Sequence, residues 1–197
     1  MRRVVLATGN RDKVKELRRL FAGVDAEVVP AFELGDAPDV VEDGTTLAEN
    51  ALKKAREIAA WCGELCVADD TGLEVAALEG APGVYAARYA GENVTYEDNW
   101  RKLLRELDGE SNRAACFRTV MAVVDPASGF EKTVDGVLDG LILDQERGQA
   151  GFGYDPVFLV PSSGRSLAEM TLAEKNDISH RARAARAMAE FLETYLA

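Results

Sequence analysis

Cysteine and histidine are scarce in this sequence. The chain has three cysteines, Cys62, Cys66 and Cys116, and a single histidine. The cysteines are odd in number and follow no repeated spacing, and no second cysteine pair or histidine cluster completes a zinc site. We therefore expect reduced cysteines that pack as small apolar groups. Reduced thiols are typical of a reducing compartment, so the sequence favours the cytoplasm.

Long apolar runs are also lacking. Met1, Arg2 and Arg3 lead into an apolar run at 4–7 that is too short for the hydrophobic region of a signal peptide. No stretch approaches the roughly 18 consecutive apolar residues that suggest a membrane span. The sequence therefore predicts neither a signal peptide nor a membrane partner.

Positive charge is in deficit. The chain has 23 Lys and Arg residues against 34 Asp and Glu residues, a formal net charge of −11. Such a field repels phosphate backbones, so a nucleic-acid polymer is not expected as the partner. A small phosphorylated ligand is still allowed, because it needs only a local cluster of cations, preferably with a metal ion that cancels its charge.

The length of 197 residues and the 47% hydrophobic content suit one domain over residues 1–197. Strands and helices mix along the chain without repeats, which predicts an α/β fold on a mixed sheet. Strands are expected at 4–7, 26–30, 65–68, 115–125, 132–143 and 156–160. Helices are expected at 12–21, 46–61, 95–107 and 179–196, the second of them with a capping box at its start.

The first loop carries a possible anion site. Thr8, Gly9 and Asn10 join a buried strand to a helix whose first turn contains Arg11 and Lys13. Cations in a first turn oppose the helix dipole, so they make sense if an anion binds there. The loop lacks the Gly-Lys-Ser/Thr signature of a Walker A motif. A solvated strand–helix turn is the alternative.

The last helix repeats this pattern. Ser179 is a good N-cap, yet His180 and Arg181 occupy the first turn, and Lys175 lies just before it. A single histidine is more often a packed or surface residue than a ligand. Two helix starts that both carry cations nevertheless favour a shared polyanion.

Acidic groups complete the candidate chemistry. Asp69 and Asp70 end a short apolar run and are followed by Thr71 and Gly72, while Glu42 precedes the second helix. Carboxylates at the carboxyl end of a buried strand lie where open α/β sheets bind ligands. Mg²⁺ prefers one or two carboxylates together with phosphate oxygens and waters. The alternative is an Asx turn at residues 70–72.

The segment 151–156 reads Gly-Phe-Gly-Tyr-Asp-Pro. Glycines allow the backbone to approach a ligand closely, and an aromatic ring between them can stack on a base. An aromatic plug over the core is the alternative.

Six motifs occur in a fixed order along the chain. They are Thr8-Gly9-Asn10 with Lys13, Glu49-Asn50-Ala51, Ala68-Asp69-Asp70-Thr71-Gly72-Leu73, Gly80-Ala81-Pro82-Gly83-Val84-Tyr85 with Arg88-Tyr89, Phe152-Gly153-Tyr154-Asp155-Pro156, and Ser179-His180-Arg181. With these motifs the chain resembles the inosine triphosphate pyrophosphatase family, the dITP/XTP diphosphatases, from the first strand to the last helix. Each tripeptide alone carries no weight, but the ordered set is highly specific.

The resemblance implies a homodimeric, Mg²⁺-dependent enzyme whose elongated mixed sheet, flanked by helices, carries two lobes around a central active-site cleft. It implies hydrolysis of deaminated purine nucleoside triphosphates, namely dITP, ITP and XTP, to the monophosphate and pyrophosphate. A pyrophosphatase for other modified nucleotides and a non-catalytic nucleotide-binding regulator are the alternatives. The Asp69-Asp70 pair speaks against the regulator.

The resemblance also implies roles for individual residues. Asp70 would accept the proton of the attacking water and, with Glu42, bind the metal ion. Thr71 stands where the family usually has serine, and its hydroxyl is retained. The implied phosphate contacts are Thr8, Gly9, Asn10, Lys13 and Lys54, and the implied base and sugar contacts are Phe152, Gly153, Tyr154, Asp155, Lys175, His180 and Arg181.

Overall fold

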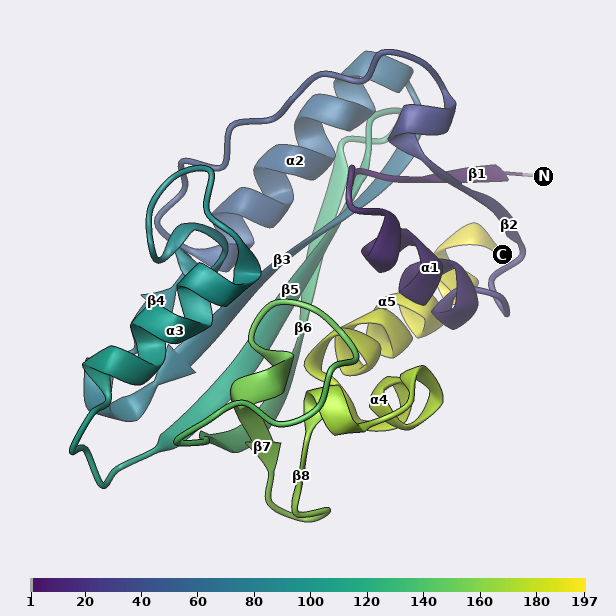
Figure 1. Ribbon diagram of the computed structural model, residues 1–197. Helices are drawn as coiled ribbons and strands as arrows, with labels where there is room; N and C mark the ends of the chain where they lie inside the picture. The colour runs from purple at the N-terminus through teal and green to yellow at the C-terminus, as the bar shows by residue number, and fades with distance from the viewer. Residues whose placement is uncertain (1) are drawn as a thin grey trace. The chain divides into compact units, whose positions relative to one another are not determined.

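A mixed sheet of eight strands organises residues 2–197, the part of the chain that the computed structural model describes (Figure 1). The strands are β1 (Arg2–Leu6), β2 (Ala26–Pro30), β3 (Leu65–Val75), β4 (Pro82–Gly83), β5 (Ala114–Asp125), β6 (Phe130–Ile142), β7 (Phe158–Val160) and β8 (Arg165–Ser166). Their order is β2-β1-β3-β5-β6-β7-β8, and β4 pairs with β3 off this path. β1 runs parallel to β2 and β3, whereas β7 is antiparallel to β6 and β8. The predicted α/β class with a mixed sheet is confirmed.

The described residues form five α-helices. They are α1 (Arg11–Leu20), α2 (Leu47–Cys62), α3 (Tyr96–Glu106), α4 (Leu172–Ile178) and α5 (His180–Leu196). The predicted capping box of α2 is present, because Thr46 accepts from the Glu49 amide and Glu49 reaches back to the Thr46 amide. Helix α4 and strands β4 and β8 were not predicted, since each is too short to show a period. Lys175, which the sequence places just before the last helix, therefore lies on α4.

Strand β3 is much longer than the sequence suggested. The predicted strand ended at Ala68, but β3 continues through Asp69 and Asp70 to Val75. The prediction that the two carboxylates lie beyond the strand is wrong, and so is the alternative of an Asx turn. What ends near Ala68 is the parallel pairing with β1, whose last partners are Leu6 and Val67. Polar residues in the middle of a strand hid this continuation.

The chain divides into two compact units. Unit 1 comprises the residues up to Asp70, Thr119–Gly136 and His180–Ala197, and unit 2 comprises Thr71–Arg118 and Val137–Ser179. In unit 1, α1 and α5 pack against each other and, with one face of β1, β3 and β5, enclose an apolar core (Figure 1). Alternating residues of β3 belong to that core, such as Leu65 and Val67, while Cys66 is buried on the other side.

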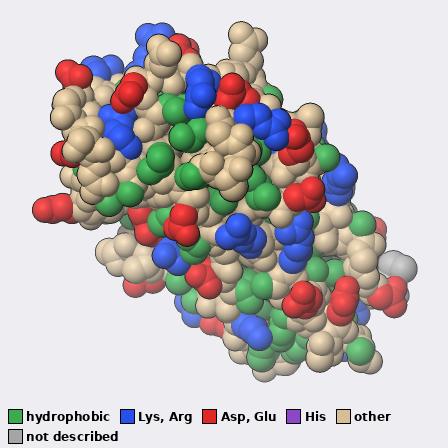
Figure 2. Space-filling view, turned by 90° about the horizontal axis from the view of Figure 1, so that it is seen from below, with side chains coloured by type: hydrophobic (Ala, Val, Ile, Leu, Met, Phe, Trp, Pro, Cys, Tyr) green, Lys and Arg blue, Asp and Glu red, His purple; other side chains and the backbone are tan. Residues whose placement is uncertain are grey.

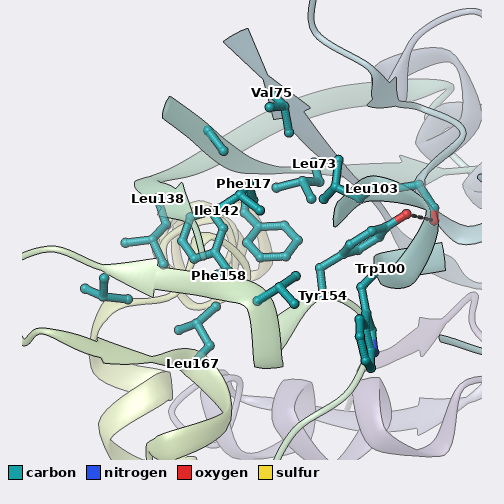
Figure 3. Packing of buried hydrophobic residues seen from close by; sticks show 14 of the residues in the cluster. Leu73, Val75, Trp100, Leu103, Phe117, Leu138, Ile142, Tyr154, Phe158 and Leu167 are labelled. Atoms are coloured by element: carbon teal, nitrogen blue, oxygen red, sulfur yellow. Dashed lines mark hydrogen bonds between the residues drawn. The ribbon is translucent and has the colours of Figure 1, made fainter. Parts of the chain in front are cut away.

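The core of unit 2 is built from β3, β5, β6, β7 and α3 (Figure 3). Phe117 and Phe158 lie at its centre with ring centroids 4.6 Å apart. Tyr154 is buried at the edge of this core, and its hydroxyl donates to the Ala86 carbonyl oxygen at 2.8 Å (Figure 3). This contact anchors the 151–156 segment to the apolar interior.

Gly136 of β6 lets the start of α5 approach the sheet. A methyl group at Gly136 would overlap the His180 carbonyl oxygen and would lie 2.5 Å from the Ala184 backbone nitrogen. We expect Gly136→Ala to lower the free energy of unfolding by about 2–3 kcal/mol, because backbone atoms cannot move aside easily. Urea denaturation followed by circular dichroism measures the change.

Gly23→Ala is the control for this substitution. Its added methyl group would meet only the Glu193 side chain, at 3.7 Å. We expect a change within about 0.5 kcal/mol. Equal stability of the two variants would show that the glycine is not required where α5 meets β6.

Candidate active site

The loop between β1 and α1 is ordered by its own polar side chains. Asn10 caps α1, since its Oδ1 accepts from the amides of Asp12 at 2.9 Å and Lys13 at 3.2 Å. The Thr8 hydroxyl accepts from the Asn10 amide at 3.2 Å. A side chain at Gly9 would meet nothing within 4 Å. The loop therefore borders open space at the start of a helix, where anions bind favourably.

Asp69 holds two cations in unit 1. Its Oδ2 lies 2.9 Å from Lys13 Nζ and 3.4 Å from Arg181 Nε. A second carboxylate, Glu16 on α1, lies 2.7 Å from Arg181 Nη1. We call these four residues the Asp69 cluster. The side chains of Glu16, Asp69 and Arg181 are 6% exposed or less, so the charges compensate one another away from water.

Electrostatics keep the Asp69 carboxylate ionised. Burial alone would raise the pKa of Asp69, but the positive charges of Lys13, Arg181 and Lys54 outweigh it and hold this pKa well below its usual range. Burial also lowers the pKa of the Lys13 ammonium, although Asp69 opposes this shift. Asp69 Oδ1 is buried without a hydrogen-bond partner among residues 2–197. An oxygen in that state suits an additional donor, such as a water molecule or a ligand.

Asp70 belongs to a different group of residues. Asn50 Nδ2 donates to Asp70 Oδ2 at 3.1 Å, and Lys54 Nζ lies 3.9 Å from Asp70 Oδ1. Lys54 Nζ also lies 3.0 Å from Glu42 Oε2. The Lys54 ammonium thus lies within ion-pair distance of both carboxylates. We call Glu42, Asn50, Lys54 and Asp70 the Asp70 cluster.

This donor set fits a divalent cation. Burial raises the pKa of Asp70, and the charge of Glu42 raises it further against the opposing charge of Lys54. Carboxylate oxygens are the protein ligands that Mg²⁺ prefers. No group of three or more His, Cys, Asp or Glu side chains with metal-binding geometry occurs between residues 2 and 197. Phosphate oxygens and waters would complete the coordination.

His180 lies at the start of α5 and is 3% exposed. Its Nδ1 is 2.6 Å from the Thr119 hydroxyl. The helix predicted at 179–196 is observed as α5 from His180, and Arg181 projects from it into the Asp69 cluster. Glu16 and Thr119, the buried partners of Arg181 and His180, were missed by sequence reasoning. The only signal for Glu16 was its position one turn after Lys13.

In unit 2 the 151–156 segment is tied to α4. Asp155 Oδ2 accepts from Lys175 Nζ at 2.7 Å and from the Phe152 amide at 3.0 Å, and the Lys175–Asp155 pair is buried. The same ammonium lies 4.6 Å from the centre of the Phe152 ring. Gly151 has φ +78°, and a side chain there would overlap the Asp155 carboxylate. The segment therefore presents Phe152 on a fixed loop.

The predicted site residues fall into both units. Unit 1 contains Thr8, Gly9, Asn10, Lys13, Glu42, Lys54, Asp70, His180 and Arg181. Unit 2 contains Thr71, Phe152, Gly153, Tyr154, Asp155 and Lys175. Among these residues, Lys54 pairs with Glu42 and Asp70, and Lys175 pairs with Asp155. Lys13 and Arg181 instead pair with Asp69, and His180 pairs with Thr119. The six motifs also contain Asp69 and Asn50, for which the sequence predicts no individual role.

Acidic and basic side chains are interspersed with apolar ones on the face shown in Figure 2. Within the described chain, no helix combines the length and the hydropathy that crossing a bilayer demands.

The fold and the two clusters define an α/β protein with an ionic site built around the third strand of a mixed sheet. More particularly, the chain belongs to the Ham1 family, whose model matches residues 4–191. The resemblance drawn from the six motifs is thereby confirmed. A dITP/XTP pyrophosphatase of Thermoanaerobacter sp. (strain X514) is 50% identical over 182 residues, 91% of each chain. A dITP/XTP pyrophosphatase of Caldanaerobacter subterraneus subsp. tengcongensis is 48% identical over 98% of this chain and 96% of its own.

Solved structures agree with this assignment. A HAM1 protein from Coxiella burnetii superimposes with a TM-score of 0.91 at 40% identity, covering 98% of both chains. The Ham1 protein of Staphylococcus aureus superimposes with a TM-score of 0.90 at 39% identity, covering 98% of this chain and all of its own.

The Asp69 cluster predicts a specific pH dependence of stability. Because the pKa of Asp69 is depressed in the folded state, the ionised carboxylate stabilises the fold fully above the unfolded-state pKa of about 4. That stabilisation is lost as the pH falls through the folded-state pKa. Asp69→Asn leaves Lys13 and Arg181 short of a counter-charge, so we expect a loss of about 3–5 kcal/mol at neutral pH. Urea midpoints measured from pH 7 to strongly acidic pH test both statements.

The wild-type protein should lose stability on acidification more steeply than Asp69→Asn. If the two curves run parallel, Asp69 is not the group that titrates. Glu27→Gln, an exposed partner of Arg3, is the control and should change the midpoint little at any pH.

Proposed function

We propose that this protein hydrolyses the deaminated purine nucleoside triphosphates dITP, XTP and ITP to the monophosphate and pyrophosphate. The observation that carries the proposal is the division of Asp69 and Asp70 between two clusters. One cluster contains Lys13 in the first turn of a helix, and the other pairs carboxylates in a donor set that suits a divalent cation. A metal-bound triphosphate requires both. The names of the relatives, dITP/XTP pyrophosphatases, support the same activity.

Phosphate binding is proposed for the loop that starts α1. The backbone amides of Thr8, Gly9 and Asn10, the Lys13 ammonium and the Lys54 ammonium are the proposed donors. Helix N-termini stabilise anions through their free amides and the helix dipole. Charge on the departing pyrophosphate would be stabilised by the same donors.

Mg²⁺ is the proposed cofactor, with Glu42 and Asp70 as its protein ligands. When bound it would neutralise triphosphate charge and polarise the phosphate that is attacked. The Asp70 carboxylate takes the proton of the attacking water. Asn50 orients the carboxylate by donating to Oδ2. Attack at the α-phosphorus releases pyrophosphate in one step.

Base choice is proposed to depend on the 6-oxo group that hypoxanthine and xanthine share. Adenine has a 6-amino donor there, so a protein donor such as Arg181 would face another donor. A buried mismatch of this kind leaves both groups without hydrogen bonds and discriminates strongly. Thr71, His180 and the unit 2 residues Phe152, Gly153, Tyr154, Asp155 and Lys175 are the further proposed substrate contacts.

A homodimer in the cytoplasm is the proposed working state. The dimer rests on the family resemblance. The cytoplasm is supported by Cys62, Cys66 and Cys116, which are all free thiols. Light scattering after size-exclusion chromatography tests the dimer.

The activity is tested by pyrophosphate release. Purified protein with Mg²⁺ is offered dITP, XTP, ITP and the common nucleoside triphosphates in parallel. The proposal expects release from the deaminated purines far above release from ATP or GTP. Release of orthophosphate in place of pyrophosphate would refute the one-step reaction, and turnover of modified pyrimidines alone would refute the substrate class.

Asp70→Asn should abolish pyrophosphate release while the protein stays folded. The substitution removes a carboxylate that takes a proton and contributes to the metal site, at nearly constant volume. Loss of general-base catalysis alone costs about 100-fold to 10,000-fold in rate. Circular dichroism confirms folding, and full activity of the folded variant would contradict the assigned role.

Lys13→Ala should weaken the binding of dITP much more than the binding of dIMP. The reason is that the Lys13 charge lies at the helix start, where the phosphate tail is proposed to bind. Calorimetric titration in EDTA compares the two ligands without turnover. Lys15→Ala, which removes an exposed cation on the same helix, is the control. Equal losses for both ligands would move Lys13 away from the terminal phosphates.

A further inference from the structure

The Asp70 cluster depends on two segments that are far apart along the chain. Glu42 lies in the loop before α2, whereas Asp70 lies in β3, the strand that follows α2 in the sequence. Their carboxylates contact a common ammonium, that of Lys54. Something must therefore hold the loop and the strand in a fixed relation, since a divalent cation requires its ligands to be close together.

Asn50 of α2 contacts both segments. Its Oδ1 accepts from the Gly44 amide at 2.8 Å, two residues after Glu42, and its Nδ2 donates to Asp70 Oδ2 at 3.1 Å. The side chain is 1% exposed, and Lys54 follows it by one helical turn on the same face. The two hydrogen bonds also fix which end of the amide faces the carboxylate, because only the NH₂ group can donate to Asp70.

The absence of a side chain at Gly44 makes room for its hydrogen bond to Asn50. A side chain at Gly44 would lie 2.6 Å from Asn50 Oδ1 and 2.9 Å from Glu49 Cβ. The loop can therefore approach the helix closely only without a Cβ at this position.

Asn99 of α3 provides an internal comparison. Each asparagine follows by four residues a threonine that caps its helix, Thr46 or Thr95. Each is buried, and each accepts from a loop amide, which for Asn99 is the Ala90 amide at 2.7 Å. Asn99 then donates to a backbone carbonyl, that of Ala87 at 3.0 Å. The donor of Asn50 is instead directed at a carboxylate of the candidate metal site.

We propose that Asn50 is a positioning residue of the cation site, which fixes the Asp70 carboxylate and the Glu42 loop on one helix so that both can bind the same divalent ion. This inference rests on the proposed function for its metal. In this proposal Asn50 acts through its hydrogen bonds to Gly44 and Asp70 and is not itself a metal ligand. Partners that orient metal ligands typically change metal affinity about 10-fold to 100-fold when they are removed.

The test measures Mn²⁺ binding by electron paramagnetic resonance, without nucleotide. Wild-type protein is compared with Asn50→Ala and with the matched control Asn99→Ala. Both variants lose a buried amide with two hydrogen bonds, so both should lose stability in urea. Only Asn50→Ala should weaken Mn²⁺ binding, by about 10-fold to 100-fold. If Asn99→Ala weakens Mn²⁺ binding equally, the effect is general destabilisation and the proposal is overturned.

Gly44→Ala tests the same inference while Asn50 and both proposed metal ligands keep their own side chains. The added methyl group should displace the Asn50 amide and weaken Mn²⁺ binding in the same direction, even if Asn50→Ala does not fold. Unchanged Mn²⁺ affinity in a folded Asn50 or Gly44 variant overturns the proposal. So does the lack of any Mn²⁺ binding to the wild-type protein at millimolar concentration.

Pyrophosphate release from dITP, measured on the same preparations, separates the two proposals. Wild-type turnover combined with unchanged Mn²⁺ binding of the variants refutes the role of Asn50 and leaves the enzymatic function standing. Weakened Mn²⁺ binding of the variants without wild-type turnover refutes the enzymatic function and supports the role of Asn50.

Discussion

The alternation of side chains along β3 governs the chemistry of unit 1. Successive residues of a strand point to opposite faces of the sheet, so Asp69 and Asp70 make their direct contacts with different side chains. Asp69 lies on the side of Val67, where α1 and α5 pack, and it meets Lys13 and Arg181. Asp70 meets Asn50 and Lys54 of α2. Two adjacent carboxylates thereby acquire opposite electrostatic settings, one with a lowered pKa and the other with a raised one.

The Asp69 cluster is difficult to explain by stability alone. Two carboxylates and two cations are removed from water, and replacing such a group by apolar residues is often neutral or stabilising. An apolar core is available on the same face of β3, because Val67 belongs to it. The buried charges of the Asp69 cluster therefore agree with the phosphate-binding role proposed for the start of α1. A triphosphate at the start of α1 would pair with the Lys13 ammonium, which in this structure pairs with Asp69.

Helix α2 organises the Asp70 cluster from its first two turns. Thr46 and Glu49 form the capping box at the N-terminus of the helix. Asn50 accepts from the Gly44 amide, and Lys54, one turn later, pairs with Glu42. The loop is thus held by neighbouring side chains of a single rigid element. Unit 2 uses a comparable arrangement, in which Asp155 holds Lys175 and the Phe152 amide together. In both units, residues that carry the proposed chemistry are positioned by a second polar side chain.

The sequence by itself determined the α/β class, most helix positions and the identity of the chemistry-bearing motifs. The start of α2 was predictable because a capping box is a local signal, and the last helix was predicted to within one residue of its observed start at His180. The extension of β3 through Asp69 and Asp70 was not, because two carboxylates in a strand contradict local propensity and are tolerated only by partners from other elements. Glu16, Thr119 and Asn50 gained their roles in the same way. Only the tertiary structure decided which partner each charge meets, since residues such as Arg181 and Asp69 are brought together by packing and not by spacing along the chain.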